Sequence, residues 1–326
     1  MRAGRISVST RAFEVVDVPT PDAGAGQVRI KVGAAGVCLS DVHFLEGILS
    51  PGYLEGDHVT LGHEVAGTID QIGAGVTTSS VGDRVVVIAG ERNTAQQITT
   101  MGFDYDGGWA EYVVTKAELV AKIPDSLPFE QAAIIPDAVS TPWAAITSTG
   151  KVVAGEKVAV FGVGGLGIHA VQLLKIIGCT VIAIDPREDA RANALARGAD
   201  YAFAPDDGEL KKHRGVTAAF DFAGVSPVRK QAISMLGEQG RLVIVGIANE
   251  PIVIPNDMAF TYMRTQIMGH YGSEAHHVTE LIELAGSGRL DLSHSVSEVM
   301  PLDKAGQALD KLANKIGNPI RIVLKP

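Results

Sequence analysis

Apolar residues in the first part of the chain, up to about residue 135, fall into short runs rich in Val, Ile and aromatic side chains. Such runs are typical of strands, and the Gly, Pro and Asp residues between them interrupt the pattern as turns do. The expected strands are residues 13–18, 28–32, 64–69, 84–88 and 109–114. This pattern predicts an irregular β-barrel or β-sandwich.

The pattern changes after Pro142, where fully apolar runs alternate with segments of helical periodicity. Fully apolar strands that alternate with helices predict a parallel, doubly wound sheet in an α/β fold. The expected strands are residues 158–161, 180–184, 217–222 and 241–247, and the expected helices are residues 168–177, 190–198 and 227–236.

The end of the chain has two helical segments, residues 280–285 and 305–313, and a last apolar strand, residues 320–324. This tail can extend the α/β part or return to the β-rich part. Periodicity alone does not choose between the two.

Length and charge narrow the class of protein. A chain of 326 residues predicts about two domains, and 46% apolar residues exclude general disorder. A net charge of −9 argues against a nucleic-acid binder or a binder of anionic membranes, both of which need a basic surface. No apolar run approaches the ~20 residues that span a bilayer, and the N-terminus lacks the apolar region of a secretory signal.

Cysteine and glycine are the informative residue counts. Cys38 and Cys179 are the two cysteines, so a disulfide framework and a Cys₄ zinc cluster are excluded and a cytoplasmic location is expected. Cys179 is expected to be buried between a helix and a strand. Glycine makes up 37 of the residues, about 11% against a usual ~7%. Such an excess indicates tight turns or backbone that another group approaches closely.

A glycine-rich segment after the strand 158–161 fits the dinucleotide-binding pattern G-x-G-x-x-G. In this pattern the first glycine makes the turn, the second admits the pyrophosphate, and the third lets helix and strand pack closely. The candidate cofactor-binding residues here are Gly162, Gly164, Gly165, Leu166 and Gly167.

Asp185 ends the next expected strand, at the spacing where a carboxylate accepts hydrogen bonds from the adenosine ribose. A carboxylate there repels a 2′-phosphate, so NAD is favoured over NADP. Arg187 works in the other direction, because a nearby cation can accommodate that phosphate. The alternative is that the glycines form only a tight turn and that Asp185 caps a helix.

Two short motifs in the β-rich part carry candidate metal ligands. They are Cys38-Leu39-Ser40-Asp41-Val42-His43 and Gly62-His63-Glu64-Val65-Ala66-Gly67. Thiolate and imidazole together suit zinc. Each motif alone is weak evidence for a metal site, because a lone cysteine is usually a small buried hydrophobe and a lone histidine is more often structural.

These motifs, in this order and ahead of a dinucleotide fold, resemble the zinc-dependent alcohol dehydrogenases of the medium-chain dehydrogenase/reductase superfamily. The resemblance covers essentially the whole chain. It extends to Gly82-Asp83-Arg84-Val85, Asp106-Gly107-Gly108-x-Ala110-Glu111-Tyr112 and the closing Ile320-Arg321. It implies a discontinuous GroES-like catalytic domain of residues 1–138 and 270–326, with a Rossmann NAD-binding domain of residues 139–269 between them.

The resemblance also implies a set of metal ligands. Cys38 and His63 match the first two ligands of a catalytic zinc, and Asp137 matches the third. The alternatives are that Asp137 merely caps a helix, or that Asp57 or His58 is the third ligand. Glu64 matches a residue that in some members is a fourth ligand or an exchanging group. The carboxylate of Asp137 is an accepted zinc donor.

The remaining assignments of the resemblance concern protons and the cofactor. Asp41 is expected to orient His63, and Ser40 and His43 are expected to carry the proton of the alcohol to solvent. Such a path suits the chemistry, because the hydroxyl proton must leave before hydride does, and zinc lowers its pKa. Arg321 matches a residue that contacts the cofactor pyrophosphate.

One departure from the family concerns its structural zinc, which four cysteines hold in many members. The matching interval, residues 86–105, contains no cysteine and looks shortened. We therefore expect one zinc per chain. Because that lobe often borders subunit contacts, its loss weakens family-based inferences about the expected homo-oligomer, a dimer or tetramer.

The sequence thus predicts a zinc- and NAD-dependent alcohol dehydrogenase that interconverts alcohols with aldehydes or ketones. One alternative is a zinc-independent quinone or enoyl reductase of the same superfamily. The presence of three candidate zinc ligands counts against it, namely Cys38, His63 and Asp137. Another is a catalytically silent dinucleotide-binding sensor, against which Ser40 and His43 count. Four aromatic residues can line a substrate cleft or belong to a core, namely Phe44, Tyr53, Trp109 and Trp143.

Overall fold

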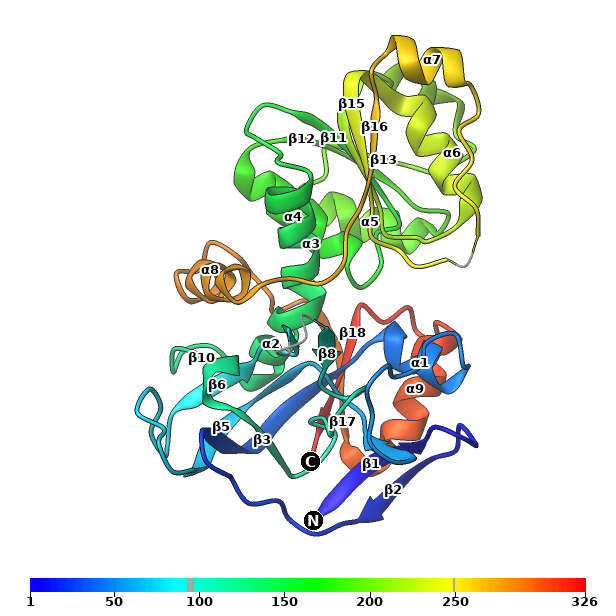
Figure 1. The fold of residues 1–326 in the computed structure, drawn as a ribbon. Helices are drawn as coiled ribbons and strands as arrows, with labels where there is room; N and C mark the ends of the chain where they lie inside the picture. Colours follow the sequence, from blue (N-terminus) through cyan, green and yellow to red (C-terminus); the bar gives the residue numbers. More distant parts are fainter. Residues whose placement is uncertain (93–96, 249) are drawn as a thin grey trace. The chain divides into compact units, whose positions relative to one another are not determined.

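The structure is a computed structural model that describes residues 1–92, 97–248 and 250–326. It divides the chain into two units, Met1–Ala138 together with Glu274–Pro326, and Val139–Ser273. The two ends of the chain therefore build one unit and the middle segment builds the other (Figure 1). The second boundary lies at Glu274 rather than at residue 270. One reason is that the His270 backbone N–H still donates to the carbonyl of Ile244 at 2.9 Å.

The first unit is built around an extended mixed sheet with strand order β10-β6-β5-β3-β18-β17, in which β9 also pairs with β3. Its pairs are antiparallel except for β17 and β18, which run parallel. A smaller sheet has the order β2-β1-β4, and β7 pairs with β8. The strands are β1 (Arg2–Ser7), β2 (Phe13–Asp17), β3 (Gln27–Val37), β4 (His58–Thr60), β5 (Val65–Ile72), β6 (Arg84–Val87), β7 (Gly90–Arg92), β8 (Ile98–Thr100), β9 (Tyr112–Lys116), β10 (Val120–Lys122), β17 (Val296–Pro301) and β18 (Arg321–Lys325).

The position of β18 settles where the tail of the chain goes. This strand pairs antiparallel with β3, with Ile322 opposite Val37 and Leu324 opposite Ala35. The C-terminal strand therefore lies directly beside the end of the strand that leads to Cys38. The tail returns to the β-rich unit.

Short helices connect and cover these strands. They are α1 (Leu39–Leu45), α2 (Phe129–Ala133), α8 (Ala275–Gly286) and α9 (Ala305–Ala313), with the 3₁₀ turns η1 (Ala117–Leu119) and η5 (Leu302–Lys304) and the π-helical turn η2 (Ile135–Val139). The hydrophobic pattern predicts α8 in part and α9 in full. It does not predict α1, which spans about two turns and so shows little periodicity.

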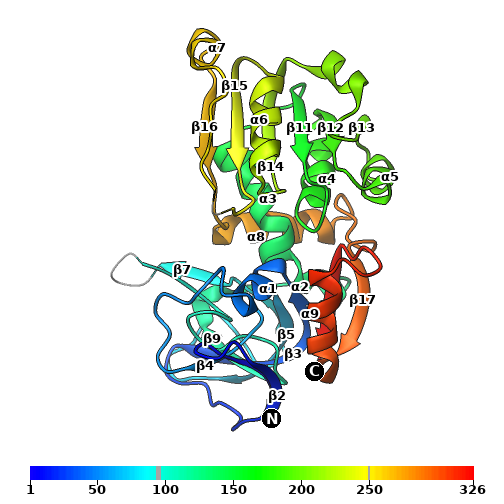
Figure 2. The ribbon, with the colours of Figure 1, turned by 90° about the vertical axis from the view of Figure 1, so that its right-hand side faces the viewer.

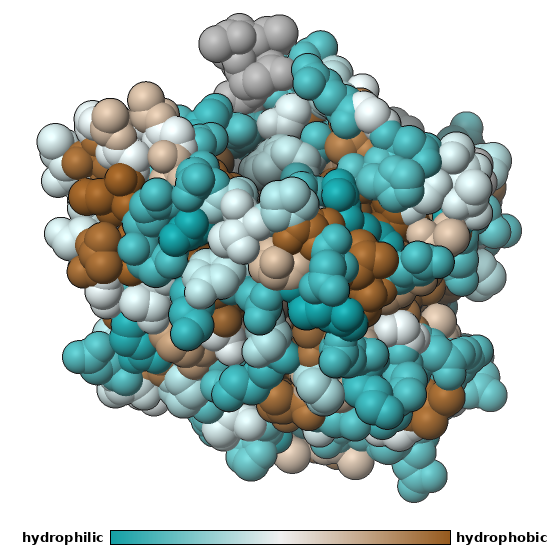
Figure 3. Space-filling view, turned by 90° about the horizontal axis from the view of Figure 1, so that it is seen from below, coloured by the Kyte–Doolittle hydropathy of each residue, from teal (hydrophilic) through white to brown (hydrophobic). Residues whose placement is uncertain are grey.

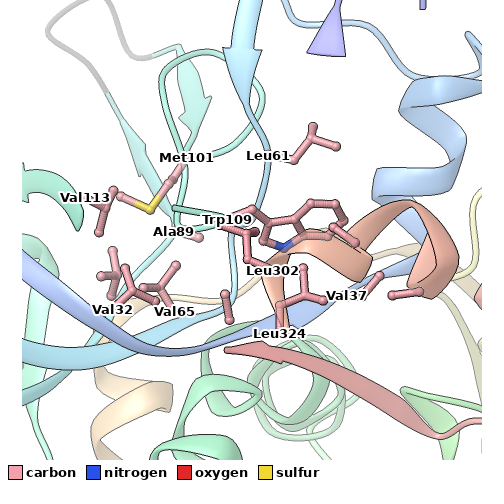
Figure 4. Close-up of a cluster of buried hydrophobic side chains, with 14 of the residues drawn as sticks. Val32, Val37, Leu61, Val65, Ala89, Met101, Trp109, Val113, Leu302 and Leu324 are labelled. Carbon is pink, nitrogen blue, oxygen red and sulfur yellow. The ribbon is translucent and has the colours of Figure 1, made fainter. Parts of the chain in front are cut away.

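The core of the first unit gathers around Trp109 (Figure 4). The indole is fully buried, and its Nε1 donates a hydrogen bond to the carbonyl of Gly36 at 2.9 Å. Gly62 lies against the ring with φ +100°, and a Cβ there would come within 2.2 Å of Trp109 Cδ1. Trp109 therefore belongs to the core rather than to a cleft, and the strand expected from residue 109 begins only at Tyr112.

The second unit is a parallel sheet with strand order β13-β12-β11-β14-β15-β16 (Figure 2). Its strands are β11 (Lys157–Phe161), β12 (Thr180–Ile184), β13 (Tyr201–Phe203), β14 (Val216–Asp221), β15 (Leu236–Ile244) and β16 (Gln266–Gly269). The order reverses between β11 and β14, as in a doubly wound sheet. The predicted α/β class is confirmed.

Helices pack on this sheet as the alternating pattern requires. They are α3 (Ser140–Ala144), α4 (Gly167–Ile177), α5 (Glu188–Ala196), α6 (Ser226–Met235) and α7 (Asp257–Tyr262), with the π-helical turn η3 (Ala145–Thr149) and the 3₁₀ turn η4 (Gly208–His213). In this unit α4 contacts β11 and β12, whereas α6 contacts β14 and β15.

One face of the molecule is mainly hydrophilic, with apolar residues in separate patches (Figure 3). Among the described residues, no helix is both long and apolar enough to cross a lipid bilayer. The hairpin β7–β8 lies within residues 86–105, where the sequence predicts no structural zinc. Residues 93–96 of that interval lie outside the described part of the chain.

Candidate functional site

Three side chains with metal-binding atoms meet in the first unit. The ligand atoms of Cys38, His63 and Asp137 all lie within 4.8 Å of one another. The thiol of Cys38 donates to Asp137 Oδ2 at 3.3 Å, and His63 Nε2 lies 3.6 Å from the same oxygen. Cys38 and His63 are buried, while Asp137 is half-buried. A thiol, an imidazole and a carboxylate thus converge from three separate segments.

The local backbone explains why Cys38 and His63 can reach this point. Cys38 follows β3 and precedes α1, and its backbone N–H donates to Asp41 Oδ2 at 2.8 Å. His63 follows Gly62, whose positive φ turns the chain sharply between β4 and β5. Only a residue without Cβ fits beside Trp109 at that turn. The core therefore sets the direction of the histidine.

A buried arginine joins this group from the other end of the chain. Arg321 Nη2 donates to Glu64 Oε1 at 2.7 Å and to Asp137 Oδ2 at 3.1 Å. Its side chain is 2% exposed, and that of Glu64 is fully buried. The sequence resemblance assigns Arg321 to the cofactor pyrophosphate, and that assignment stays a prediction. The structure adds that this guanidinium bridges a candidate ligand and its neighbouring carboxylate.

Glu64 fits at this place because its neighbour is a glycine. A Cβ on Gly36 would lie 1.9 Å from Glu64 Oε2. The Glu64 carboxylate also accepts from the backbone N–H of Ala138 at 3.0 Å, directly after Asp137. Glu64 thus ties the segment of Asp137 to the segment of His63. No pattern in the sequence singles out Gly36 for this role.

The charges in the group act on one another strongly. Burial raises the pKa of Glu64 to about 7, although Arg321 opposes the shift. Burial also acts to raise the pKa of Asp137, but His63 and Arg321 outweigh it and hold that pKa well below its usual range. For His63, burial lowers the pKa, and the carboxylates of Asp41 and Asp137 more than reverse the effect.

The donor set fits a zinc ion. Catalytic zinc sites take three protein ligands from Cys, His and Asp or Glu and leave one position open. In the group of Cys38, Asp41, His63, Glu64, Asp137 and Arg321, the acidic side chains outnumber the one permanent cation. A divalent cation among them would offset this excess negative charge. His63 Nδ1 and Glu64 Oε2 have no hydrogen-bond partner among the described residues.

The residues expected to move a proton lie beside this group. Ser40 Oγ is 3.4 Å from His63 Nε2. Asp41 Oδ1 is 3.5 Å from His63 Nδ1, which is close enough to favour one orientation of the ring. Ser40 and His43 lie on the same side of α1, because residues spaced by three are neighbours on a helix. Among the described residues no hydrogen bond joins Ser40 to His43, so a proton path between them would need a further hydroxyl or a water.

The alternative ligands Asp57 and His58 have other surroundings. Asp57 Oδ2 accepts from Ser7 Oγ at 2.7 Å, and its Oδ1 accepts from the backbone N–H of Ser9 at 2.8 Å. Those bonds hold the turn after β1. Within the described residues, the group that holds three metal-binding side chains contains Asp137 and neither alternative.

The glycine-rich turn of the second unit has the geometry that the dinucleotide pattern needs. Gly162 has φ +81°, and a Cβ on it would lie 2.9 Å from the backbone nitrogen of Ala223. A Cβ on Gly167 would lie 1.9 Å from the carbonyl oxygen of Gly162. Near Gly164 the first side-chain atom is Arg187 Nη2, at 3.7 Å from the position of a Cβ. The turn is therefore tight at its ends and more open in the middle.

Asp185 lies directly behind this turn. Its Oδ2 accepts from the backbone N–H of Val163 at 3.0 Å, and its Oδ1 accepts from Arg187 Nε at 3.1 Å. The carboxylate thus braces the glycine turn as well as standing at the end of β12. Its negative charge is partly offset by Arg187.

Known families match both units. Residues 24–125 match the alcohol dehydrogenase GroES-like domain family, and residues 165–287 match the zinc-binding dehydrogenase family. The GroES-like domain expected for the β-rich unit is thereby confirmed.

Individual proteins match along nearly the full length of the chain. It is 31% identical to an alcohol dehydrogenase of Geobacillus stearothermophilus, over 100% of this chain and 99% of that protein. It is 29% identical to an NAD-dependent alcohol dehydrogenase of Sulfurisphaera tokodaii, over 96% of this chain and 97% of the relative. A solved structure of 2R,3R-butanediol dehydrogenase from Bacillus subtilis superposes with a TM-score of 0.90 at 28% identity, covering 100% of this chain and 99% of that one.

The buried arginine generates a first prediction. Arg321→Met leaves Glu64 with an unpaired buried charge, which costs about 3–5 kcal/mol in the free energy of unfolding. Since a bound zinc ion would offset part of that charge, zinc should stabilise this variant more than it stabilises the unaltered protein. The measurement is the melting temperature with zinc and after chelation, for both proteins.

Arg2→Met is the matched control, because it breaks an exposed ion pair with Asp303 in the same unit. Such pairs contribute about 0–1 kcal/mol, so this variant should melt like the unaltered protein in both conditions. Equal zinc-dependent shifts in Arg321→Met and the unaltered protein would contradict the electrostatic coupling.

Proposed function

This chain belongs to the zinc-type alcohol dehydrogenase family, and we propose that it oxidises alcohols to aldehydes or ketones with one zinc and NAD. The reverse reaction follows from the same site. The observation that carries the proposal is the meeting of Cys38, His63 and Asp137 ligand atoms within 4.8 Å. Overall, an alcohol and NAD⁺ give a carbonyl compound, NADH and a proton.

The three ligands are proposed to hold zinc and to leave one position open for the substrate oxygen. Bound there, zinc supplies a Lewis acid that lowers the pKa of an alcohol hydroxyl. The work of the protein is then to keep the ligands deprotonated and correctly placed. Arg321 supports this by holding Asp137, and Asp41 by orienting His63.

The proton of the alcohol is proposed to leave through Ser40 and His43. Ser40 Oγ lies near the ligand atom of His63, so it can accept the hydroxyl proton while it donates its own. His43 is half-buried, and its imidazole can pass a proton on to solvent. A hydroxyl or water between the two completes the path.

The cofactor is proposed to bind at the glycine-rich turn of the second unit. Gly162, Gly164, Gly165, Leu166 and Gly167 supply the backbone that faces the pyrophosphate. Asp185 would accept from the ribose hydroxyls, which favours NAD. The NAD-dependent relative supports this choice.

The two other functions are less well supported. A zinc-independent quinone or enoyl reductase has no use for a cysteine, a histidine and an aspartate whose ligand atoms converge. A catalytically silent sensor has no use for a serine placed beside the metal ligands.

Metal analysis tests the proposed site. Protein purified without added zinc should contain about one zinc per chain, and chelation should abolish NAD-dependent alcohol oxidation. Asp137→Ala should weaken zinc binding at least about 100-fold, since even residues that only support a ligand contribute 10–100-fold. The measurements are zinc content and competition with a chelating dye.

Asp57→Ala is the matched control for this test. It removes the carboxylate of an alternative ligand, which accepts hydrogen bonds from Ser7 and Ser9. It should keep its zinc. Unchanged zinc affinity in Asp137→Ala would refute that ligand, and a zinc-free protein that reduces enones would refute the function. Assays of primary alcohols, secondary alcohols and polyols would identify the substrate class.

A second variant tests the cofactor preference. Asp185→Gly removes the carboxylate that faces the ribose and that pairs with Arg187, so the preference for NAD over NADP should fall by about tenfold or more. The measurement is the ratio of kcat/KM for the two cofactors. The control Asp189→Asn alters an exposed acid in the first turn of α5, close to Asp185 in the sequence, and should leave that ratio unchanged. An unaltered ratio in Asp185→Gly would remove it from the cofactor site.

The assembly and location are proposals as well. A homo-oligomer, a dimer or tetramer, is supported by exposed apolar residues near the edge strand β16, where Ile252 is 51%, Met258 75% and Tyr262 82% exposed. The expected mass by light scattering is therefore two or four times 34.1 kDa. A monomer at micromolar concentration would contradict this. A cytoplasmic location fits two buried, unpaired cysteines.

A further inference from the structure

A buried ion pair lies at one end of the parallel sheet, outside every motif discussed so far. Arg229 Nε donates to Asp221 Oδ2 at 3.1 Å. The Arg229 side chain is 4% exposed and that of Asp221 is fully buried. Arg229 comes from the first turn of α6, and Asp221 is the last residue of β14.

The pair stands at the point where the strand order reverses. Asp221 is opposite Phe161 of β11 on one side and opposite Ile244 of β15 on the other. Phe161 directly precedes the glycine turn. In open parallel sheets, ligands bind outside the carboxyl ends of the strands at this reversal. The ion pair therefore lies directly behind the loops that would face a dinucleotide.

The two side chains fasten both of these loops. Asp221 Oδ1 accepts from the backbone N–H groups of Ala223 and Gly224 at 2.9 and 3.0 Å, which fixes the loop after β14. Arg229 Nη2 donates to the carbonyl of Gly246 at 3.1 Å, which fixes the loop after β15. The guanidinium thus holds the loop after β15 directly and the loop after β14 through the Asp221 carboxylate.

The loops are packed too closely to shift independently. A Cβ on Gly246 would lie 2.4 Å from the nitrogen of Gly224. The nitrogen of Ala223, in turn, lies 2.9 Å from the position of a Cβ on Gly162. The glycine turn, the loop after β14 and the loop after β15 therefore form one contiguous layer of backbone. A displacement of Gly246 would be passed to its neighbours.

Stability alone does not explain this pair. A buried ion pair adds little to the free energy of unfolding compared with apolar residues of the same size, because both charges lose their hydration. Burial raises the pKa of Asp221, although the loop N–H groups and Arg229 oppose it. A cation near a helix N-terminus is also disfavoured by the helix dipole. The main effect of the pair is therefore to fix the positions of the loops after β14 and β15.

We propose that Arg229 is a positioning residue that, through Asp221, holds the loops for the nicotinamide-bearing half of the cofactor. A doubly wound sheet takes one mononucleotide on each half, and Asp185 belongs to the adenosine half. The β14 and β15 loops belong to the other half. This inference rests on the proposed dinucleotide site.

Two ligands that differ by the nicotinamide ring test this role. NADH contains both mononucleotides, whereas ADP-ribose lacks the nicotinamide. Arg229→Met should weaken NADH binding about tenfold or more, as expected when a binding surface is displaced, and should leave ADP-ribose binding unchanged. Binding is measured by calorimetry on the full-length zinc-loaded protein, together with KM and kcat for the cofactor.

Arg241→Met is the matched control. Arg241 pairs with Glu156, which directly precedes β11 at the opposite end of the same sheet, and its side chain is 16% exposed. Its loss should lower the melting temperature and leave both affinities unchanged. Arg229→Lys keeps the charge but lacks the planar group that reaches both Asp221 and Gly246, so it should show a smaller loss for NADH alone.

The outcomes are distinct. Selective loss of NADH binding in Arg229→Met, or in Arg229→Lys if the first variant does not fold, supports the proposal. Equal loss of NADH and ADP-ribose, or no loss of either, overturns it. If the unaltered protein binds neither ligand, the proposed dinucleotide site itself is wrong, whatever the variants do.

Discussion

The candidate metal site depends on one buried guanidinium. Arg321 lies on the last strand of the chain, and its two hydrogen bonds reach Glu64 and Asp137. Glu64 adjoins the candidate ligand His63, so the arginine touches two of the segments that carry candidate ligands. The carboxylates of Glu64 and Asp137 lie close together and repel each other, and this cation offsets part of that repulsion. The pairing of β18 with β3 places the guanidinium where it is needed.

Close backbone approach is the second constraint, and it explains part of the glycine excess. Gly36 leaves room for Glu64, and Gly62 leaves room for Trp109. In the other unit, Gly162 and Gly167 let the turn and the fingerprint helix α4 approach each other. At each position a Cβ would meet an atom that belongs to the site or to its support. These glycines set the spacing of functional groups, whereas many others only relieve turns.

The two units divide the proposed chemistry. All the proposed metal ligands and proton carriers lie in the unit made of both chain ends. The glycine turn, Asp185 and the Asp221–Arg229 pair lie in the unit made of the middle segment. In the first unit the candidate metal site lies beside the core around Trp109. In the second unit the glycine turn and the ion pair lie at the carboxyl ends of central strands of the parallel sheet. Metal binding and cofactor binding can thus be measured separately.

Hydrophobic periodicity and local motifs were enough to predict the parallel sheet, the glycine turn, and Cys38 and His63 as candidate ligands. The reason is that period, turn residues and motif spacing are properties of neighbouring residues. They were not enough for the return of the tail, the burial of Trp109 or the bridge from Arg321 to Glu64. Those features join segments far apart in the chain, and no local pattern records which distant segment supplies a partner. Tertiary packing decided them, because a buried charge or indole is stable only where the fold brings its partner.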